Sequence, residues 1–91
     1  MYKPTFSIII PTFNSIKTIN KTVRSVLNQT YKNYEVIIID DGSTDNTFVK
    51  VKELKDSRIK LFSINKSGGP AKPRNFGIYK STSNWICFLD S

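Results

Sequence analysis

The sequence predicts one α/β domain, a Rossmann-like β-α-β-α-β-α-β chain in which helices flank a mostly parallel sheet. Short β-branched segments alternate with segments of helical period along its 91 residues. Hydrophobic residues make up 38% of the chain, and twelve of them are Ile, which is enough for one core. Strands that alternate with helices lie parallel and are joined by right-handed crossovers. We therefore expect a single domain over residues 1–91.

The first strand and the first helix have clear patterns. Residues 6–10 are rich in β-branched side chains and predict a buried strand that closes at Pro11. Residues 15–28 carry apolar side chains at helical spacing and predict a helix capped by Asn14 or Ser15.

The middle of the chain continues the alternation. Residues 35–39 predict a second buried strand, which ends at an acidic pair, and residues 45–55 predict a helix with one apolar face. Residues 58–64 predict a third strand, and residues 65–70 predict a loop that contains two glycines.

The last segments complete the pattern. A third helix is expected to begin at Ala71 or Pro73 and to end at Lys80. Residues 85–89 are the longest apolar run and predict the last strand, with Cys87 as a small buried hydrophobic residue. Five residues are too few to span a bilayer, which takes about 20.

The composition excludes several kinds of site. The chain has no His and one Cys, which excludes Ser-His or Cys-His nucleophile pairs and Cys/His metal clusters within it. We expect no secretory leader, and together with the single Cys this favours a cytoplasmic setting. Fourteen Lys and Arg against seven Asp and Glu give a net charge of +7, which attracts phosphorylated ligands, polyanions or anionic headgroups.

Polar side chains are expected to gather where the strands end, because parallel sheets bind ligands outside the carboxyl ends of their strands. These ends carry Pro11, Thr12, Phe13 and Asn14, then Asp40, Asp41 and Gly42, then Gly68 and Gly69, and finally Asp90.

Three of these positions suggest nucleotide chemistry. Asp41 is expected to bind N–H groups of its own turn, which leaves Asp40 to accept a hydrogen bond from a base. The Phe13 ring, just beyond a strand end, can stack on a nucleobase. A carboxylate at Asp90 can hold a hard divalent cation.

The segment from residue 65 to residue 75 combines glycines, cations and the start of a helix. Helix N–H groups together with Arg74 suit a diphosphate, whereas Lys66 and Lys72 are predicted to be solvated loop residues. Neither GxGxxG nor GxxxxGK[ST] is present, so the usual dinucleotide and P-loop patterns are absent.

Five motifs extend over nearly the whole chain. They are SIIIPTFN (7–14), SVLNQT (25–30), VIIIDDGSTD (36–45), AKPRNFG (71–77) and WICFLDS (85–91). In this order and spacing they resemble the nucleotide-sugar-binding N-terminal portion of the family 2 glycosyltransferases, which have a GT-A fold. Pro73 departs from the small residue usual in that family.

The resemblance implies roles for the matching positions. Pro11, Thr12 and Phe13 would line the base pocket, Asp40 would accept from the base edge, and Asp41 would support the turn or the ribose. The substrate-binding residues expected in this way are Pro11, Thr12, Phe13, Asn14, Asp40, Asp41, Gly42, Arg74 and Asp90.

Two further positions concern the diphosphate and the metal. Arg74 would lie near the diphosphate or order Asp40. Asp90 matches the first Asp of the DXD motif, which helps to place Mg²⁺ or Mn²⁺. The second Asp of that motif and the catalytic base are expected downstream of Ser91, so no catalytic residue is expected in this chain and it should be inactive alone.

The resemblance also implies a reaction. The complete enzyme would transfer a sugar, with inversion and a divalent metal, from a nucleoside-diphosphate sugar to an acceptor hydroxyl. A UDP-sugar donor, a saccharide or lipid-linked acceptor and a role in cell-envelope polysaccharide synthesis are the expectations. The basic surface fits peripheral association with the inner face of the cell membrane.

Two other classes share parts of this pattern. A phosphoacceptor receiver domain also alternates strands and helices and has an acidic pair, but its pair follows the first strand, and its fifth strand with a Lys has no counterpart here. A nucleic-acid-binding module would fit the charge of +7, but most of the six Phe fall at expected core positions. We therefore expect no nucleic-acid partner.

Overall fold

Strands and helices alternate along the computed structural model, which describes residues 4–29, 31–69 and 71–90. The elements are β1 (Phe6–Thr12), α1 (Ile19–Leu27), β2 (Tyr34–Asp41), α2 (Thr47–Lys52), β3 (Ile59–Ile64), α3 (Ala71–Lys80) and β4 (Trp85–Phe88). The expectations for the first three residues, Thr30, Pro70 and Ser91 lie outside the described residues.

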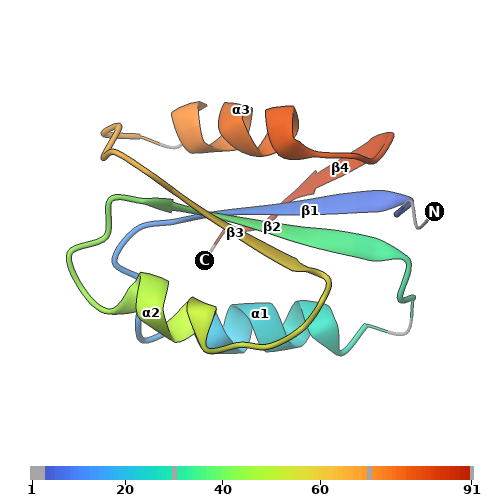
Figure 1. Cartoon of the computed structure of the whole chain (residues 1–91), viewed down its shortest axis with the longest axis horizontal. Helices are drawn as coiled ribbons and strands as arrows, with labels where there is room; N and C mark the ends of the chain where they lie inside the picture. The colour runs from blue at the N-terminus through green and yellow to red at the C-terminus, as the bar shows by residue number, and fades with distance from the viewer. Residues whose placement is uncertain (1–3, 30, 70, 91) are drawn as a thin grey trace.

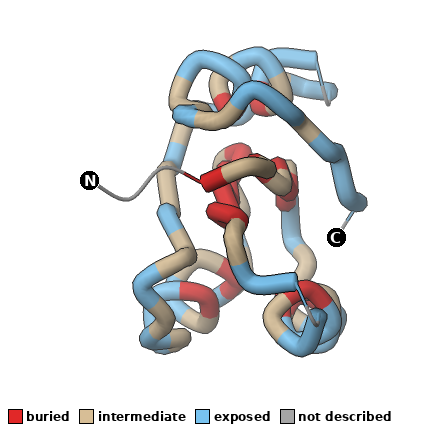
Figure 2. Tube along the Cα trace, turned by 90° about the vertical axis from the view of Figure 1, so that its right-hand side faces the viewer, coloured by how far each residue is buried: buried red, intermediate tan, exposed pale blue. Residues whose placement is uncertain are grey.

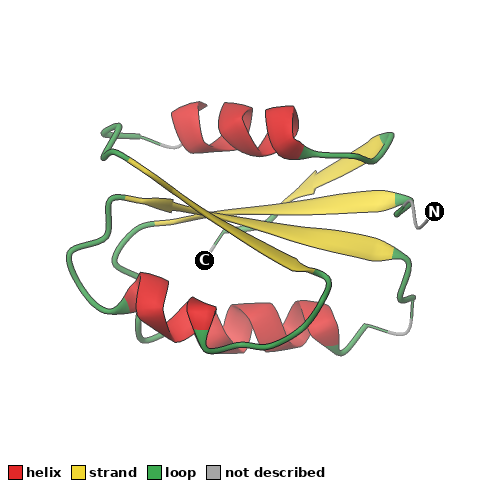
Figure 3. Cartoon of the chain, viewed as in Figure 1, coloured by secondary structure: helices red, strands yellow, loops and turns green. Residues whose placement is uncertain are grey.

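The sheet has the order β3-β2-β1-β4, and each of its strand pairs is parallel. Helices α1 and α2 cover one face and α3 covers the other, which makes three layers (Figures 1 and 3). The predicted α/β fold is confirmed. No helix among the described residues is long and apolar enough to cross a membrane.

Alternation along the central strands divides the core between the two faces of the sheet. Ile10 and Ile38 belong to the cluster on the side of α1 and α2, whereas Ile9, Ile37 and Ile39 form the cluster on the side of α3. Figure 2 shows the buried sheet between the helical layers. All eight residues of β2 are buried, which explains the continuous apolar run over residues 36–39.

Helix α3 approaches the sheet closely at Gly77. A Cβ added to this glycine would lie 2.5 Å from Ile9 Cγ2 and 2.9 Å from Ile39 Cδ1. The absent side chain therefore sets the distance between helix and sheet.

A buried carboxylate joins four segments at the amino-terminal edge of the sheet, opposite the strand ends. Glu35 Oε1 accepts from Lys60 Nζ at 2.5 Å, and Glu35 Oε2 accepts from Ser7 Oγ at 2.5 Å and from Thr82 N at 2.8 Å. The Glu35 side chain is 2% exposed, so each of these bonds replaces one to water. This glutamate network ties β1, β2 and β3 to the connection between α3 and β4.

The sequence predicted that the first strand ends at Pro11, but β1 continues to Thr12. Pro11 pairs with Ile39 of β2, whereas the pairing of β1 with β4 ends at Ile9 and Phe88. Proline is tolerated where a strand has a neighbour on one side only. The separation of β4 from β1 beyond Ile9 also opens the sheet between them.

The first two helices are shorter than predicted. Helix α1 begins at Ile19, because residues 16–18 form a turn, and its cap position is Thr18 rather than Asn14 or Ser15. Helix α2 begins only at Thr47, whose N–H and hydroxyl both donate to Asp45 Oδ1. The residues predicted to form the first turns of α1 and α2 therefore make loop hydrogen bonds instead.

The start of α3 and the environment of β4 settle two other expectations. Helix α3 begins at Ala71, so Pro73 lies in the first turn, where backbone N–H groups have no partner within the helix. The prediction that Cys87 is buried is wrong: it is exposed, because β4 is an edge strand. Trp85 and Phe88 of the same strand are also exposed.

Candidate functional site

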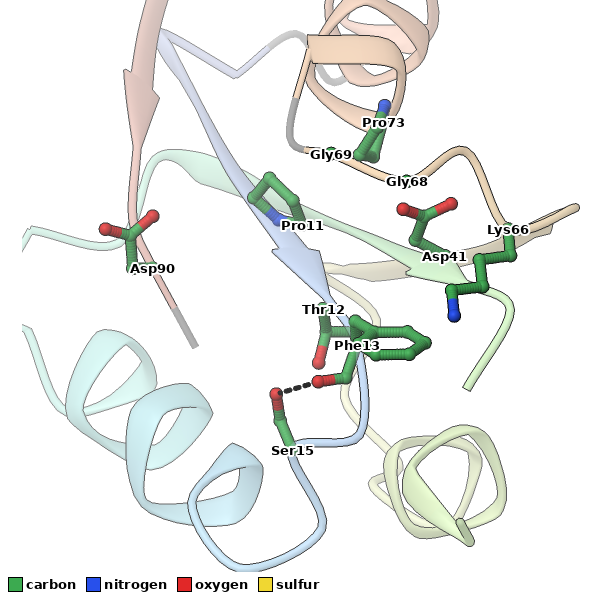
Figure 4. Close-up of a pocket in the computed structure, with 10 residues that line it drawn as sticks. All are labelled: Pro11, Thr12, Phe13, Ser15, Asp41, Lys66, Gly68, Gly69, Pro73 and Asp90. Carbon is green, nitrogen blue, oxygen red and sulfur yellow. Dashed lines mark hydrogen bonds between the residues drawn. The ribbon is translucent and has the colours of Figure 1, made fainter. Parts of the chain in front are cut away.

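A cavity of about 420 Å³ opens at the carboxyl ends of β1, β2 and β4. It lies where the strand order reverses between β1 and β4, the usual ligand position in such sheets. Its volume falls in the range of small-molecule sites. The lining residues, drawn in Figure 4, are Pro11, Thr12, Phe13, Ser15, Asp41, Lys66, Gly68, Gly69, Pro73 and Asp90.

Asn14 fixes the loop that presents Phe13 at the mouth of the cavity. Its backbone has a φ of 49°, its N–H donates to Ser43 Oγ at 2.9 Å, and its Oδ1 accepts from Thr44 N at 2.8 Å. Ser15 Oγ donates to Phe13 O at 3.2 Å. Asn14 therefore joins the β1–α1 loop to the β2–α2 loop, and the Phe13 ring stays 42% exposed.

The two aspartates at the end of β2 bind different loops. Asp40, not Asp41, binds its own turn: it accepts from Ser43 N at 3.2 Å and from Ser43 Oγ at 2.5 Å. Asp41 accepts from Ser67 N at 2.9 Å and from Ser67 Oγ at 2.8 Å, and it lines the cavity. The expectation that Asp41 binds its own turn is therefore wrong, whereas acceptance by Asp40 from a base stays a prediction.

The β3–α3 loop packs directly against the turn that follows β2. Gly42 has a φ of +70°, and a Cβ there would lie 2.8 Å from Lys66 N, so only glycine fits. The Lys66 ammonium lies over the Phe13 ring, 5.0 Å from its centroid. The Lys66 side chain is exposed in this loop, as predicted, and it also lines the cavity beside Phe13, which the sequence did not predict.

Arg74 and Asp90 meet on the opposite side of the cavity. Arg74 Nη2 lies 3.6 Å from Asp90 Oδ1, and the guanidinium lies 5.5 Å from the centre of the Phe88 ring. The Asp90 side chain is 91% exposed, so this ion pair contributes little to stability. Arg74 thus contacts Asp90, whereas the partner found for Asp40 is Ser43.

A neighbouring carboxylate, Asp45, organises the adjacent loops. The hydrogen bond from the Thr47 hydroxyl, with further bonds from Thr47 N–H and Ile16 N–H, lowers the pKa of Asp45 below its usual 3.8. Asp45 is therefore charged at neutral pH and holds the β1–α1 loop beside α2.

The oxygen donors around the cavity suit a cation held partly by its ligand. Asp41 and Asp90 line the cavity, and within the described ranges no three Asp, Glu, Cys or His side chains cluster. Mg²⁺ characteristically takes one or two protein carboxylates and completes its shell with water and substrate phosphates. The exposed Asp90 carboxylate fits that arrangement.

Five of the residues predicted from the sequence meet at the cavity, and four lie behind it. The cavity includes Pro11, Thr12, Phe13, Asp41 and Asp90. The other four make contacts in the loops around the cavity; they are Asn14, Asp40, Gly42 and Arg74. The sequence did not predict Ser15, Lys66 or Pro73 as lining residues.

The sequence profile described as Glycosyl transferase family 2 matches residues 7–91. The chain belongs to glycosyltransferase family 2. An Escherichia coli relative named UDP-Glc:alpha-D-GlcNAc-diphosphoundecaprenol beta-1,3-glucosyltransferase WfgD is 46% identical over 85 residues. The match covers 93% of this chain but 34% of that enzyme, so the chain spans about a third of the relative's length.

Two solved structures share the fold of this family 2 chain. The crystal structure of S. aureus TarS 1-349 in complex with UDP matches with a TM-score of 0.90 and 35% identity, over 96% of this chain and 27% of the TarS 1-349 chain. Mannosyltransferase PcManGT from Pyrobaculum calidifontis, in complex with GDP-Man and Mn²⁺, matches with a TM-score of 0.89 and 25% identity, over 99% of this chain and 28% of PcManGT.

These matches confirm the family resemblance and the N-terminal GT-A architecture predicted from the five motifs. They support the glycosyltransferase interpretation over the receiver domain and the nucleic-acid-binding module.

Proposed function

We propose that this family 2 chain is the donor-binding portion of a glycosyltransferase that uses a UDP-sugar. The observation that carries the proposal is the meeting of an exposed Phe13 ring and the Asp41 carboxylate at one cavity on the carboxyl edge of the sheet. The base would stack on Phe13, and Asp41 would accept an N–H from the base or a ribose hydroxyl. Asp40 would act indirectly, by ordering the turn through Ser43.

A buried hydroxyl supports a ligand in this cavity. Thr12 is 2% exposed, and its Oγ1 has no hydrogen-bond partner among the residues that the structure describes. A buried polar atom without a partner is costly, so a ligand or water that bonds to it gains the lost interaction. We therefore assign Thr12 to donor binding together with Pro11.

Asp90 would hold a divalent cation, Mg²⁺ or Mn²⁺, together with oxygens of the donor diphosphate. When bound, such a cation neutralises the charge that develops on the leaving diphosphate. Arg74, 3.6 Å from Asp90, would orient that carboxylate and add positive charge beside the same phosphates.

We propose for the complete enzyme the inverting reaction that the family resemblance implies. An acceptor hydroxyl would lose its proton to a carboxylate base and attack the anomeric carbon from the face opposite the diphosphate, which leaves with the bonding pair. We place the base and the acceptor site downstream of Ser91, so the 91-residue chain is expected to bind donor without transferring sugar. The name of the Escherichia coli relative makes a lipid-linked acceptor the favoured class.

Nucleotide titration of the ¹⁵N-labelled chain tests the proposed site. We expect UDP to shift amide resonances of Phe13, Asp41 and the 65–69 loop, more strongly than GDP, and Mg²⁺ to add shifts at Asp90. The amides of Glu35 and Thr82, at the opposite, amino-terminal edge of the sheet, serve as the internal control. A folded chain whose spectrum does not change with UDP or GDP would contradict the donor-binding function.

Removal of the proposed stacking ring is expected to weaken UDP binding markedly. Base–aromatic stacking is worth about 1–3 kcal/mol, so Phe13→Ala should raise the Kd for UDP by about 5-fold to about 150-fold in calorimetric titration. Tyr79→Ala is the matched control, since this ring is 81% exposed on α3 and outside the cavity. Equal Kd values for Phe13→Ala and the unchanged chain would exclude stacking on Phe13.

We also propose that the chain works in the cytoplasm at the inner face of the cell membrane. Lys17, in the turn before α1, and Lys21 and Arg24 of α1 are exposed, and cations near an anionic leaflet contribute about 1 kcal/mol each. The chain should sediment with vesicles that contain anionic lipid, and Lys17→Gln/Lys21→Gln/Arg24→Gln should remove most of that binding. If the chain bound neutral vesicles as well as anionic ones, the proposed electrostatic membrane association through these three cations would be excluded.

A further inference from the structure

Lys66 crosses the mouth of the cavity from the β3–α3 loop to the β1–α1 loop. Figure 4 shows its side chain directed at Phe13, with Asp41 beside it. The backbone of Lys66 is fixed against Gly42, and the next residue, Ser67, donates two hydrogen bonds to Asp41. A rigid backbone thus carries a long flexible side chain whose ammonium lies 5.0 Å from the ring centroid.

The charge of the cavity gives this lysine a second partner. Of the ten residues that line the cavity, Lys66 is the cation, whereas Asp41 and Asp90 are carboxylates. A nucleoside diphosphate brings several further negative charges, and its phosphates would be repelled by both carboxylates without compensation. An ammonium in the same cavity supplies part of that compensation.

We propose that Lys66 is a donor-binding residue whose ammonium moves from the Phe13 ring to the donor diphosphate when the base stacks on that ring. The inference rests on the proposed donor-binding function and adds one residue to it. A base on the ring and the ammonium on the ring compete for the same face, so a nucleoside alone must displace the cation without gaining a charge pair. A nucleoside diphosphate gives the displaced ammonium a new partner, because the Lys66 ammonium can pair with its phosphates. The cavity should therefore bind nucleoside diphosphates more tightly than nucleosides.

Calorimetric titration of the 91-residue chain with uridine and with UDP tests this exchange. In Lys66→Met, which keeps most of the length of the side chain and removes its charge, we expect UDP to bind about tenfold more weakly and uridine to bind as well or better. Lys66→Arg should retain the preference for UDP. Lys72→Met is the matched control, because Lys72 is an exposed lysine of α3 outside the cavity.

The outcomes separate the two proposals. An unchanged Kd for UDP in Lys66→Met, or an equal loss for uridine and UDP, would overturn the role of Lys66 while leaving the donor site in place. A native chain that binds neither ligand would overturn the donor-binding function and the role of Lys66 with it. Raising the salt concentration should weaken UDP binding more in the native chain than in Lys66→Met, since the charge pair is partly exposed.

Discussion

Glu35→Ala is expected to lower the free energy of unfolding by about 3 kcal/mol, the low end of the cost of breaking a buried ion pair. Lys60 is 43% exposed and can turn to water, so the loss comes mainly from the hydrogen bonds that buried Ser7 and the Thr82 backbone donate, and from the space that the Glu35 side chain leaves. Urea unfolding followed by far-ultraviolet circular dichroism measures it. Glu53→Ala, at an exposed glutamate, is the matched control and should stay within about 0.5 kcal/mol.

The same network predicts how stability depends on pH. Burial raises the pKa of the Glu35 carboxyl, but hydrogen bonds from Lys60, Ser7 and Thr82 outweigh burial and leave the pKa below 4.5. The stabilisation from Glu35 is therefore complete above pH 4.5 and is lost as the pH falls through the folded-state pKa. Glu35→Gln should flatten the acid side of the stability curve. An acid profile identical to that of the native chain would show that Glu35 is not stabilised as a carboxylate.

Gly77→Ala is expected to destabilise the chain by about 2 kcal/mol, although alanine is the better helix former. The new Cβ would lie 2.5 Å from Ile9 Cγ2, on a β-branched side chain of the central strand that cannot turn away. Helix α3 must then lift from the sheet. The urea midpoint, followed by Trp85 fluorescence, reports the loss.

Gly69→Ala separates this steric effect from the general cost of replacing a glycine. A Cβ at Gly69 meets nothing within 4 Å, so this variant should be as stable as the native chain or slightly more stable. If Gly77→Ala proved equally harmless, α3 could not pack on Ile9 as closely as the structure has it.

The order of the elements could be predicted because each carries its own local pattern. The alternation of strand and helix periods predicted the parallel sheet. The strand ends near Phe13, Asp41 and Asp90 predicted the edge of the sheet where a ligand is expected. The exact element ends were less predictable. Loop contacts such as Asn14 with Thr44 took the place of the expected start of α1.

Side-chain contacts between segments far apart in the sequence could not be predicted from local patterns. Glu35 appears in the sequence as the first residue of a strand, and its partners Ser7, Lys60 and Thr82 come from three other segments. The hydrogen bond from Ser67 N–H to Asp41 likewise joins two segments that lie far apart in the sequence.

The pairing of Phe6 with Trp85 joins almost the two ends of the chain. Closing so long a loop is entropically costly and slow compared with the nearer pairing of β1 with β2. Asp90 reaches the cavity only through this last pairing, so the site is completed late in folding. A ligand that contacts both Phe13 and Asp90 would stabilise the pairing of β4 with β1. Loss of that pairing would in turn weaken binding of the ligand.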